Sequence, residues 1–296
     1  MTHPKTNLHF GDSDVPDSGR EDADIVILPL CYEAAPSYGE GAGDGPYHIL
    51  NASAQLEDID EETLIDWSGL NIHTHPAVVP DGSPEHAVEQ MKQAAEKILR
   101  ENKFLLTLGG DHAASIGPIT AAADRYPELG VLQIDAHLDL RDVWNGSRYN
   151  HACVMRRAAA DRNLPVVQVG IRSFSKEEYA FLKKTNFTTL FAHDMDGPDQ
   201  DWIEMVINAL PDTVYLTIDL DGLDPSVVPG TGTPEPGGLS YRQLIRLIRN
   251  VGRSKTVVAA DITELSKIEG FQVSEFTAAK IATKIFVYCF NPPPLE

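Results

Sequence analysis

Seven short apolar runs recur along this chain of 296 residues and constrain its fold more than any other feature. Each run is rich in β-branched residues and too short for a buried helix, so each predicts a strand. The runs cover residues 24–30, 103–110, 130–137, 165–173, 188–194, 213–221 and 256–262. Continuous apolar runs are typical of parallel strands buried on both faces.

Helical patterns lie between these runs. One helix is expected to begin after Ser83, which can cap its first turn. Another is expected after Ser240, which has capping-box spacing with Gln243, and Gly252 lies where that helix should end. Because strands alternate with helices and no linker or repeat interrupts them, we expect one α/β domain over residues 1–296.

The charge balance limits the possible partners. The chain carries 44 acidic and 24 basic residues, a formal net charge of -20. No basic stretch stands out to neutralise phosphates, which argues against nucleic acid and against a membrane surface as partners. The acidity favours a small cationic substrate, with solubility as the simpler explanation.

The cysteines and the N-terminal segment indicate the compartment. Cys31, Cys153 and Cys289 are odd in number and lack metal-site spacing, which favours a reducing environment. No basic segment followed by an apolar one begins the chain, and no stretch approaches 18 apolar residues. We therefore expect a cytoplasmic protein.

Acidic and histidine residues gather where four of the predicted strands end. Ligands bind at the carboxyl ends of parallel strands, so these residues mark a candidate site. The four ends carry "LGGDH" up to His112, "IDAHLD" up to Asp139, "TIDLD" up to Asp221, and "DITEL" around Glu264.

Alternation along an extended chain is expected to bring these side chains together. Asp135, His137 and Asp139 should share one face, as should Asp219 and Asp221. Burying so many like charges would be costly unless cations lay among them. Each motif alone could be a solvated strand end or a helix cap, but together they predict metal ions. The oxygen-rich set suits Mn²⁺, with Ni²⁺, Co²⁺ or Fe²⁺ possible.

The motifs also resemble a known family. "LGGDH", "IDAHLDLRD", "YNHACVMRR", "TIDLDGLDPSVVPGTGTPEPGGLS" and "DITEL" are similar, in order, to the motif series of the ureohydrolases, the arginases and agmatinases. The resemblance covers almost the whole chain. It implies a three-layer α/β/α fold with a mostly parallel central sheet, two Mn²⁺ per subunit, and a homo-oligomer, either trimer or hexamer.

The resemblance assigns the metal ligands. It implies one metal held by four side chains and a second held by two more, with two carboxylates bridging. Asp139 would also orient the attacking hydroxide. The first set is His112, Asp135, Asp139 and Asp219, the second is His137 and Asp221, and the bridges are Asp135 and Asp219.

Two further residues receive catalytic roles by the same resemblance. Glu264 would bind the guanidinium, since a carboxylate suits a planar fork of N–H donors. His151 would protonate the departing amine, which requires an acid with a pKa near neutral. The alternative for Glu264 is an acidic residue at a strand end without a catalytic role, and for His151 a histidine at a helix start without one.

The substrate is expected to be agmatine, cleaved to putrescine and urea. Ser173 and Phe174 stand where arginases carry an acidic residue, and the polar cluster that binds the α-carboxylate is missing. Asp142 could bind agmatine's distal ammonium, whereas Arg148 could bind the carboxylate of a guanidino acid. Trp144 could shrink the pocket for free guanidine. Arginine remains a further alternative.

Other functions and weaker motifs complete the expectations. A deacetylase-like amidohydrolase would lack the second metal-site pair, and a noncatalytic metal-binding protein would release no urea. His73 and His75 are interpreted as surface strand residues. The glycine-rich segment 39–45 is interpreted as a loop that walls the site, with no helix opening directly after it.

Overall fold

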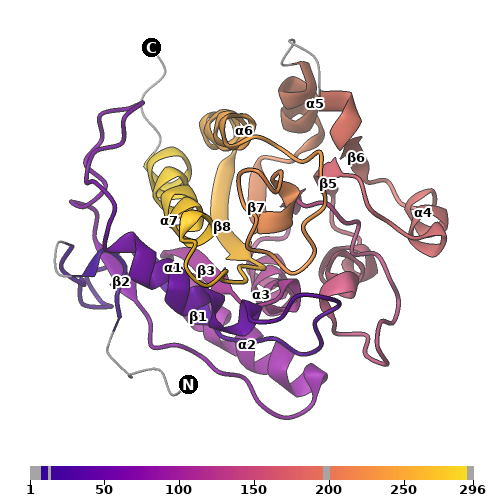
Figure 1. Ribbon diagram of the computed structural model, residues 1–296, viewed down its shortest axis with the longest axis horizontal. Helices are drawn as coiled ribbons and strands as arrows, with labels where there is room; N and C mark the ends of the chain where they lie inside the picture. The colour runs from indigo at the N-terminus through magenta and orange to yellow at the C-terminus, as the bar shows by residue number, and fades with distance from the viewer. Residues whose placement is uncertain (1–7, 13–14, 196–200, 292–296) are drawn as a thin grey trace.

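A single eight-stranded sheet forms the centre of the computed structural model, which describes residues 8–12, 15–195 and 201–291. All neighbouring strands are parallel, in the order β2-β1-β3-β8-β7-β4-β5-β6 (Figure 1). The strands are β1 Ile25–Leu30, β2 Ile72–Thr74, β3 Phe104–Gly109, β4 Leu129–Ile134, β5 Val166–Ile171, β6 Thr188–Phe191, β7 Thr213–Asp219 and β8 Thr256–Thr263. All seven expected strands are present. The short β2 contains His73, as expected, but it ends at Thr74, so the expectation that His75 is also a strand residue is wrong.

Helices cover both faces of this sheet, so the expected three-layer α/β/α arrangement is confirmed. One hydrophobic core lies under α1, α5, α6 and α7, and a second lies under α2 and α3 on the other face. The expected domain bounds, 1–296, include ends that lie outside the described residues. The helices are α1 Gly45–Ser53, α2 Pro84–Arg100, α3 Ile116–Arg125, α4 Lys176–Leu182, α5 Asp201–Ala209, α6 Tyr241–Ser254 and α7 Val273–Ile285.

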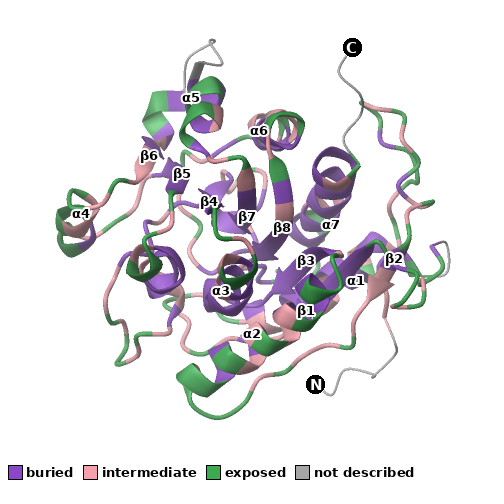
Figure 2. Ribbon diagram, turned by 180° about the vertical axis from the view of Figure 1, so that it is seen from behind, coloured by how far each residue is buried: buried purple, intermediate pink, exposed green. Residues whose placement is uncertain are grey.

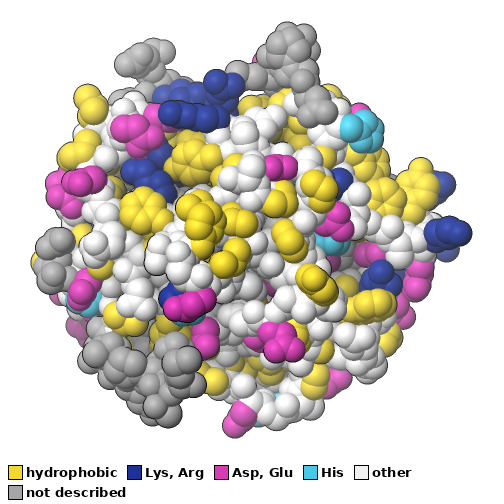
Figure 3. Space-filling model, viewed as in Figure 1, with side chains coloured by type: hydrophobic (Ala, Val, Ile, Leu, Met, Phe, Trp, Pro, Cys, Tyr) yellow, Lys and Arg dark blue, Asp and Glu magenta, His cyan; other side chains and the backbone are white. Residues whose placement is uncertain are grey.

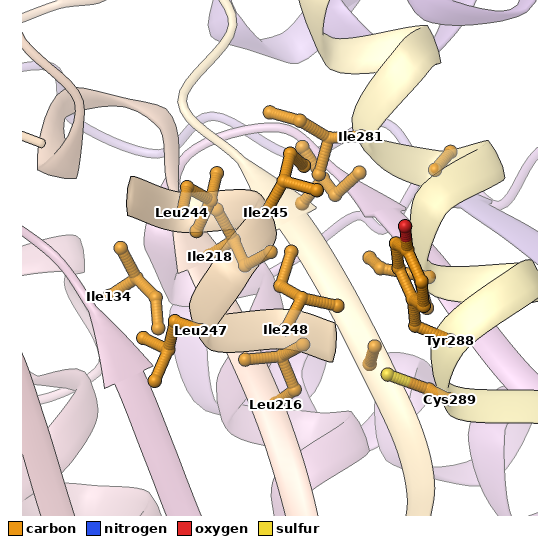
Figure 4. Packing of buried hydrophobic residues seen from close by; sticks show 14 of the residues in the cluster. Ile134, Leu216, Ile218, Leu244, Ile245, Leu247, Ile248, Ile281, Tyr288 and Cys289 are labelled. Carbon is orange, nitrogen blue, oxygen red and sulfur yellow. The ribbon is translucent and has the colours of Figure 1, made fainter. Parts of the chain in front are cut away.

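The buried layer explains why the strands read as apolar runs. Figure 2 shows the central strands as buried, with exposed residues on the outer sides of helices and in loops. An apolar face of α6 packs on this layer: Leu244, Leu247 and Ile248 face Leu216 and Ile218 of β7 (Figure 4). Each such fully buried side chain contributes roughly 1.5–3 kcal/mol.

The start of α6 follows the prediction, but its end does not. The Ser240 and Gln243 side chains form the expected capping box. The helix continues to Ser254, so the expected stop at Gly252 is wrong. A Cβ atom at Gly252 would lie 2.0 Å from the carbonyl oxygen of Tyr288, so the glycine permits close packing inside the helix.

Gly252→Ala should therefore lower the free energy of unfolding by about 1–3 kcal/mol, because the added methyl group must push α6 away from Tyr288. Urea titration followed by circular dichroism measures this difference. Gly69→Ala is the matched control, since a Cβ there has no neighbour closer than 3.8 Å. Equal stability of the two variants would contradict the packing argument.

The glycine-rich segment also departs from expectation. A short helical turn, Ala42–Asp44, leads directly into α1, so the expectation that no helix opens there is wrong. The Glu33 carboxylate accepts hydrogen bonds from the backbone N–H groups of Gly41 and Gly43, which satisfies donors at the start of this turn. This distant acceptor leaves no periodic signal in the local sequence.

None of the described helices combines the length and the apolar character needed to cross a bilayer. Cys31, Cys153 and Cys289 are free thiols.

Candidate metal and substrate site

The four strands that end in acidic or histidine residues are direct neighbours in the sheet. Their order is β3-β8-β7-β4, and because all are parallel their carboxyl ends meet at one edge. This edge collects the predicted site residues from four distant parts of the chain. They are His112 after β3, Asp135, His137 and Asp139 after β4, Asp219 and Asp221 at the end of β7, and Glu264 after β8.

Three carboxylates surround one ring nitrogen of His112. Its Nδ1 atom lies 3.1 Å from Asp135, 3.0 Å from Asp139 and 3.3 Å from Asp219. The ring is fully buried, which opposes its charged form, but the three carboxylates raise the pKa of His112 well above its usual value. Nδ1 makes no well-aligned hydrogen bond to any of them. Such an arrangement fits ligand atoms directed at a common cation better than a hydrogen-bonded pair.

A second group forms around His137. Its Nδ1 atom lies 3.1 Å from Asp221 and 3.5 Å from the other carboxylate oxygen of Asp135. Burial opposes the charge, yet these carboxylates raise the pKa of His137 to about 12. Asp135 therefore faces both histidines, one oxygen to each. Asp135 thus belongs to both groups that could hold a metal ion.

The backbone reaches this geometry differently from the alternation expected. β4 ends at Ile134, Asp139 has a φ of 51°, and Asp221 lies in a short helical turn. The expectation that an extended chain brings these side chains together is wrong. They converge through turns, and the positive φ of Asp139 and Glu264 marks backbone strain at the site.

A buried polar chain holds the His112 ring from behind. Its Nε2 atom lies 2.9 Å from Thr217 Oγ1, and the Thr217 hydroxyl donates to Asp261 at 2.6 Å. Tyr215 donates to the other Asp261 oxygen at 2.8 Å. These contacts fix the orientation that turns Nδ1 toward the carboxylates. Sequence reasoning missed Asp261, although it begins the "DITEL" motif.

Glu264 lies beside this cluster and lines the cavity next to it. Its Oε1 atom accepts the backbone N–H of His112 at 2.7 Å. Burial, reinforced by the negative charge of Asp111, raises the pKa of Glu264 well above its usual value. A cation in the cavity would reverse this effect and favour the carboxylate.

The cavity measures about 320 Å³ and extends from the clusters to the protein surface. Trp144 lines it, as anticipated, and so does Gly39 of the glycine-rich segment. His151 also lines it, with Nε2 2.8 Å from Ser37 Oγ. Burial, together with the charges of His112 and His137, lowers the pKa of His151 to about 4, below the near-neutral value expected.

Asp142 and Arg148 do not line this cavity. The Asp142 carboxylate binds Arg157 at 2.6 Å and Arg148 at 3.2 Å. Arg148 instead lines a separate depression beside α2 and α3. The substrate contacts expected for these two residues are therefore not supported by their positions, because their charges are used in a tertiary ion-pair network.

Sequence reasoning missed two residues that hold the site together. The Arg172 guanidinium donates to the backbone carbonyls of Asp221 and Glu235, each at 2.6 Å. It therefore holds the loop after β7 beside the His137 group. Gln133 donates to Asp135 Oδ2 at 2.7 Å, which orients the carboxylate that both groups share.

Fold and site together define a three-layer α/β/α protein with paired His–Asp clusters, each able to hold a metal ion, at the ends of neighbouring parallel strands. A model of the arginase family matches residues 23–287. The chain belongs to the arginase family, and the ureohydrolase resemblance of its motifs is confirmed.

Individual relatives and structures agree with this assignment. The chain is 38% identical to an N(1)-aminopropylagmatine ureohydrolase of Synechocystis sp., covering 90% of this chain and 89% of the relative. It is 34% identical to an agmatinase of Pyrococcus horikoshii, with 91% and 93% covered. The crystal structure of agmatine ureohydrolase of Thermoplasma volcanium superposes with a TM-score of 0.82 at 28% identity, covering 92% of this chain and 91% of the other.

Proposed function

We propose that this protein hydrolyses agmatine, or its N1-aminopropyl derivative, to urea and the corresponding amine. The observation that carries the proposal is the half-buried Glu264 carboxylate beside the His112 and His137 clusters, all facing one cavity. A guanidinium is a planar fork of N–H donors, which a carboxylate can bind through two parallel hydrogen bonds. The relatives named for these two substrates support the same choice.

We propose two divalent cations, preferably Mn²⁺, as the cofactor, with Ni²⁺, Co²⁺ or Fe²⁺ as alternatives. When bound, they would lower the pKa of water and so supply a nucleophile for the unreactive guanidinium carbon. A one-metal, deacetylase-like site is disfavoured by the second cluster around His137. The proposed ligands are His112, Asp135, Asp139 and Asp219 for one ion and His137 and Asp221 for the other, with Asp135 and Asp219 bridging.

The charges around the cavity favour a cationic substrate over an amino acid. Among the described residues that line it, Arg141 is the only Lys or Arg. Its guanidinium stacks over Trp144 at 4.0 Å, and its Nε atom lies 3.7 Å from Glu178. An α-carboxylate would therefore enter an acidic cavity without a free cationic partner.

Agmatine should accordingly be cleaved with a kcat/KM at least roughly 10²-fold above that of arginine, since an unpaired buried charge costs several kcal/mol. The test measures urea released from agmatine, N1-aminopropylagmatine, arginine, a guanidino acid and free guanidine by Mn²⁺- and Ni²⁺-loaded protein. Comparable rates on arginine would contradict the charge argument. Cleavage of the guanidino acid or free guanidine alone would overturn the substrate choice, and no urea from any compound would favour a noncatalytic metal-binding protein.

We also propose one domain over residues 1–296, a cytoplasmic location and a homo-oligomer, either trimer or hexamer. The three free cysteines support a reducing compartment. Exposed apolar side chains support self-association: Ile268, Phe271, Val273 and Phe276 are each at least 40% exposed. Figure 3 shows hydrophobic side chains over α7 and the loop before it. Light scattering of the purified protein would give the oligomeric state.

A further inference from the structure

The His151 ring has only one nitrogen through which it can exchange a proton with the cavity. Nδ1 is buried and has no hydrogen-bond partner in the described part of the chain. Nε2 lies 2.8 Å from Ser37 Oγ, and both residues line the cavity. The Ser37 hydroxyl is therefore the group next to the exchangeable nitrogen of His151 at the cavity wall.

Trp144 determines which hydrogen bonds the Ser37 hydroxyl can still form. Its Nε1–H group donates to Ser37 Oγ at 3.2 Å. An indole nitrogen only donates, so this bond occupies one lone pair of Oγ and leaves the hydroxyl hydrogen and a second lone pair free. Arg141 stacks over the Trp144 ring at 4.0 Å and holds it in place. The hydroxyl can then donate to one group while it accepts from another.

We propose that Ser37 is a catalytic residue that relays a proton from His151 to the departing amine, and that Trp144 is its positioning residue. The proposal rests on the proposed urea-forming hydrolysis. Ser37 comes from the loop after β1, whereas Trp144 and His151 come from the segment after β4. The relay therefore joins two loops that both line the cavity.

The proton transfer balances as follows. His151 takes up the proton lost by the attacking water, so that Nε2 carries a hydrogen and donates it to the free lone pair of Ser37 Oγ. As the C–N bond breaks, its electron pair goes to the amine nitrogen, which takes the Ser37 hydroxyl hydrogen. The Nε2 hydrogen passes to Oγ at the same time. His151 and Ser37 return to their neutral forms, and water has supplied OH to urea and H to the amine.

Ser37→Ala should lower kcat on agmatine by about 10- to 100-fold, within the range of general acid catalysis, with KM changed less than about threefold. Ser37→Thr keeps a hydroxyl and should recover most of the loss. Trp144→Phe removes the N–H donor but keeps a ring for Arg141, and should lower kcat by about three- to tenfold. Ser147→Ala is the matched control, because this hydroxyl lies in the Trp144 loop and bonds only to the Tyr149 backbone.

Two further measurements separate a relay from a merely structural role. A guanidine whose leaving amine is weakly basic needs no proton, so the Ser37→Ala loss should shrink to below about threefold on it. In a His151→Ala background, Ser37→Ala should cost less than about twofold, because residues that act as a unit are not additive. The Nε2 resonance of His151 in ¹⁵N NMR should also shift between wild type and Ser37→Ala.

Urea release by the wild type from agmatine is measured first, and its absence on every guanidine would overturn the proposed function and the relay together. With an active wild type, three results would each overturn the relay alone. They are a Ser37→Ala variant within about twofold of wild type on agmatine, an equal loss on both leaving groups, and an unchanged His151 Nε2 resonance.

Discussion

Asp135→Asn should lower urea release by at least about 10³-fold and reduce the bound metal to fewer than two ions per chain. Asp135 is the carboxylate that both clusters share, 3.1 Å from His112 Nδ1 and 3.5 Å from His137 Nδ1. An amide has nearly the same shape but no charge, so each metal ion would lose part of the negative charge that balances its own. Metal ions contribute several kcal/mol of charge stabilisation, and each 1.4 kcal/mol is tenfold in rate.

Elemental analysis after dialysis measures the metal, and a urea assay measures the rate. Asp212→Asn is the matched control, because this carboxylate is fully exposed and pairs with Lys255 at 3.5 Å. In the wild type, a chelator should abolish hydrolysis and added Mn²⁺ should restore it. Full activity in metal-free wild type, or an Asp135→Asn protein that keeps two ions and a tenth of the activity, would contradict the shared-ligand interpretation.

The sheet could be predicted because burial on both faces imposes a local signature. Each strand must be apolar at successive positions, so the runs around residues 104–109 and 213–219 are visible without knowledge of their neighbours. β2 has only three residues, too few for such a pattern. The short turn Ala42–Asp44 before α1 is likewise hidden, because backbone donors at its start are satisfied by Glu33, eight or more residues away.

The site residues likewise fall into those that a local sequence pattern predicts and those that depend on contacts with distant parts of the chain. Acidic residues at strand ends are visible as departures from an apolar run, and the parallel sheet brings them together. What holds them in place depends on distant partners: Arg172 reaches the Glu235 carbonyl across 63 residues, and Asp261 receives the Thr217 hydroxyl across 44. Asp142 was expected to bind substrate but instead pairs with Arg157, a partner that is recognisable only once the chain has folded.

The charge of Glu264 gives the second large effect. Glu264→Gln should lower kcat/KM for agmatine by about 30- to 4 × 10³-fold, chiefly through KM. Removing one charge from a buried, hydrogen-bonded ion pair costs about 2–5 kcal/mol, and each 1.4 kcal/mol is tenfold. The amide oxygen can still accept the His112 backbone N–H that Glu264 accepts at 2.7 Å, so the fold and the metal cluster should persist.

Steady-state kinetics with agmatine, together with metal analysis, test this expectation. Glu264→Asp is the matched variant, because it keeps the negative charge but shortens the side chain. Its carboxylate should lie farther from the guanidinium while still attracting it electrostatically. If the guanidinium is bound through charge, Glu264→Asp should have the lower KM of the two variants. A Glu264→Gln protein with wild-type KM and full metal content would show that the guanidinium is bound elsewhere in the cavity.

Burial and the negative charge of Asp111 both disfavour a negative charge on Glu264. The ionised form of Glu264 therefore needs a cation beside it. The same burial and charge that oppose ionisation of Glu264 without a cation would therefore favour binding of a guanidinium next to it.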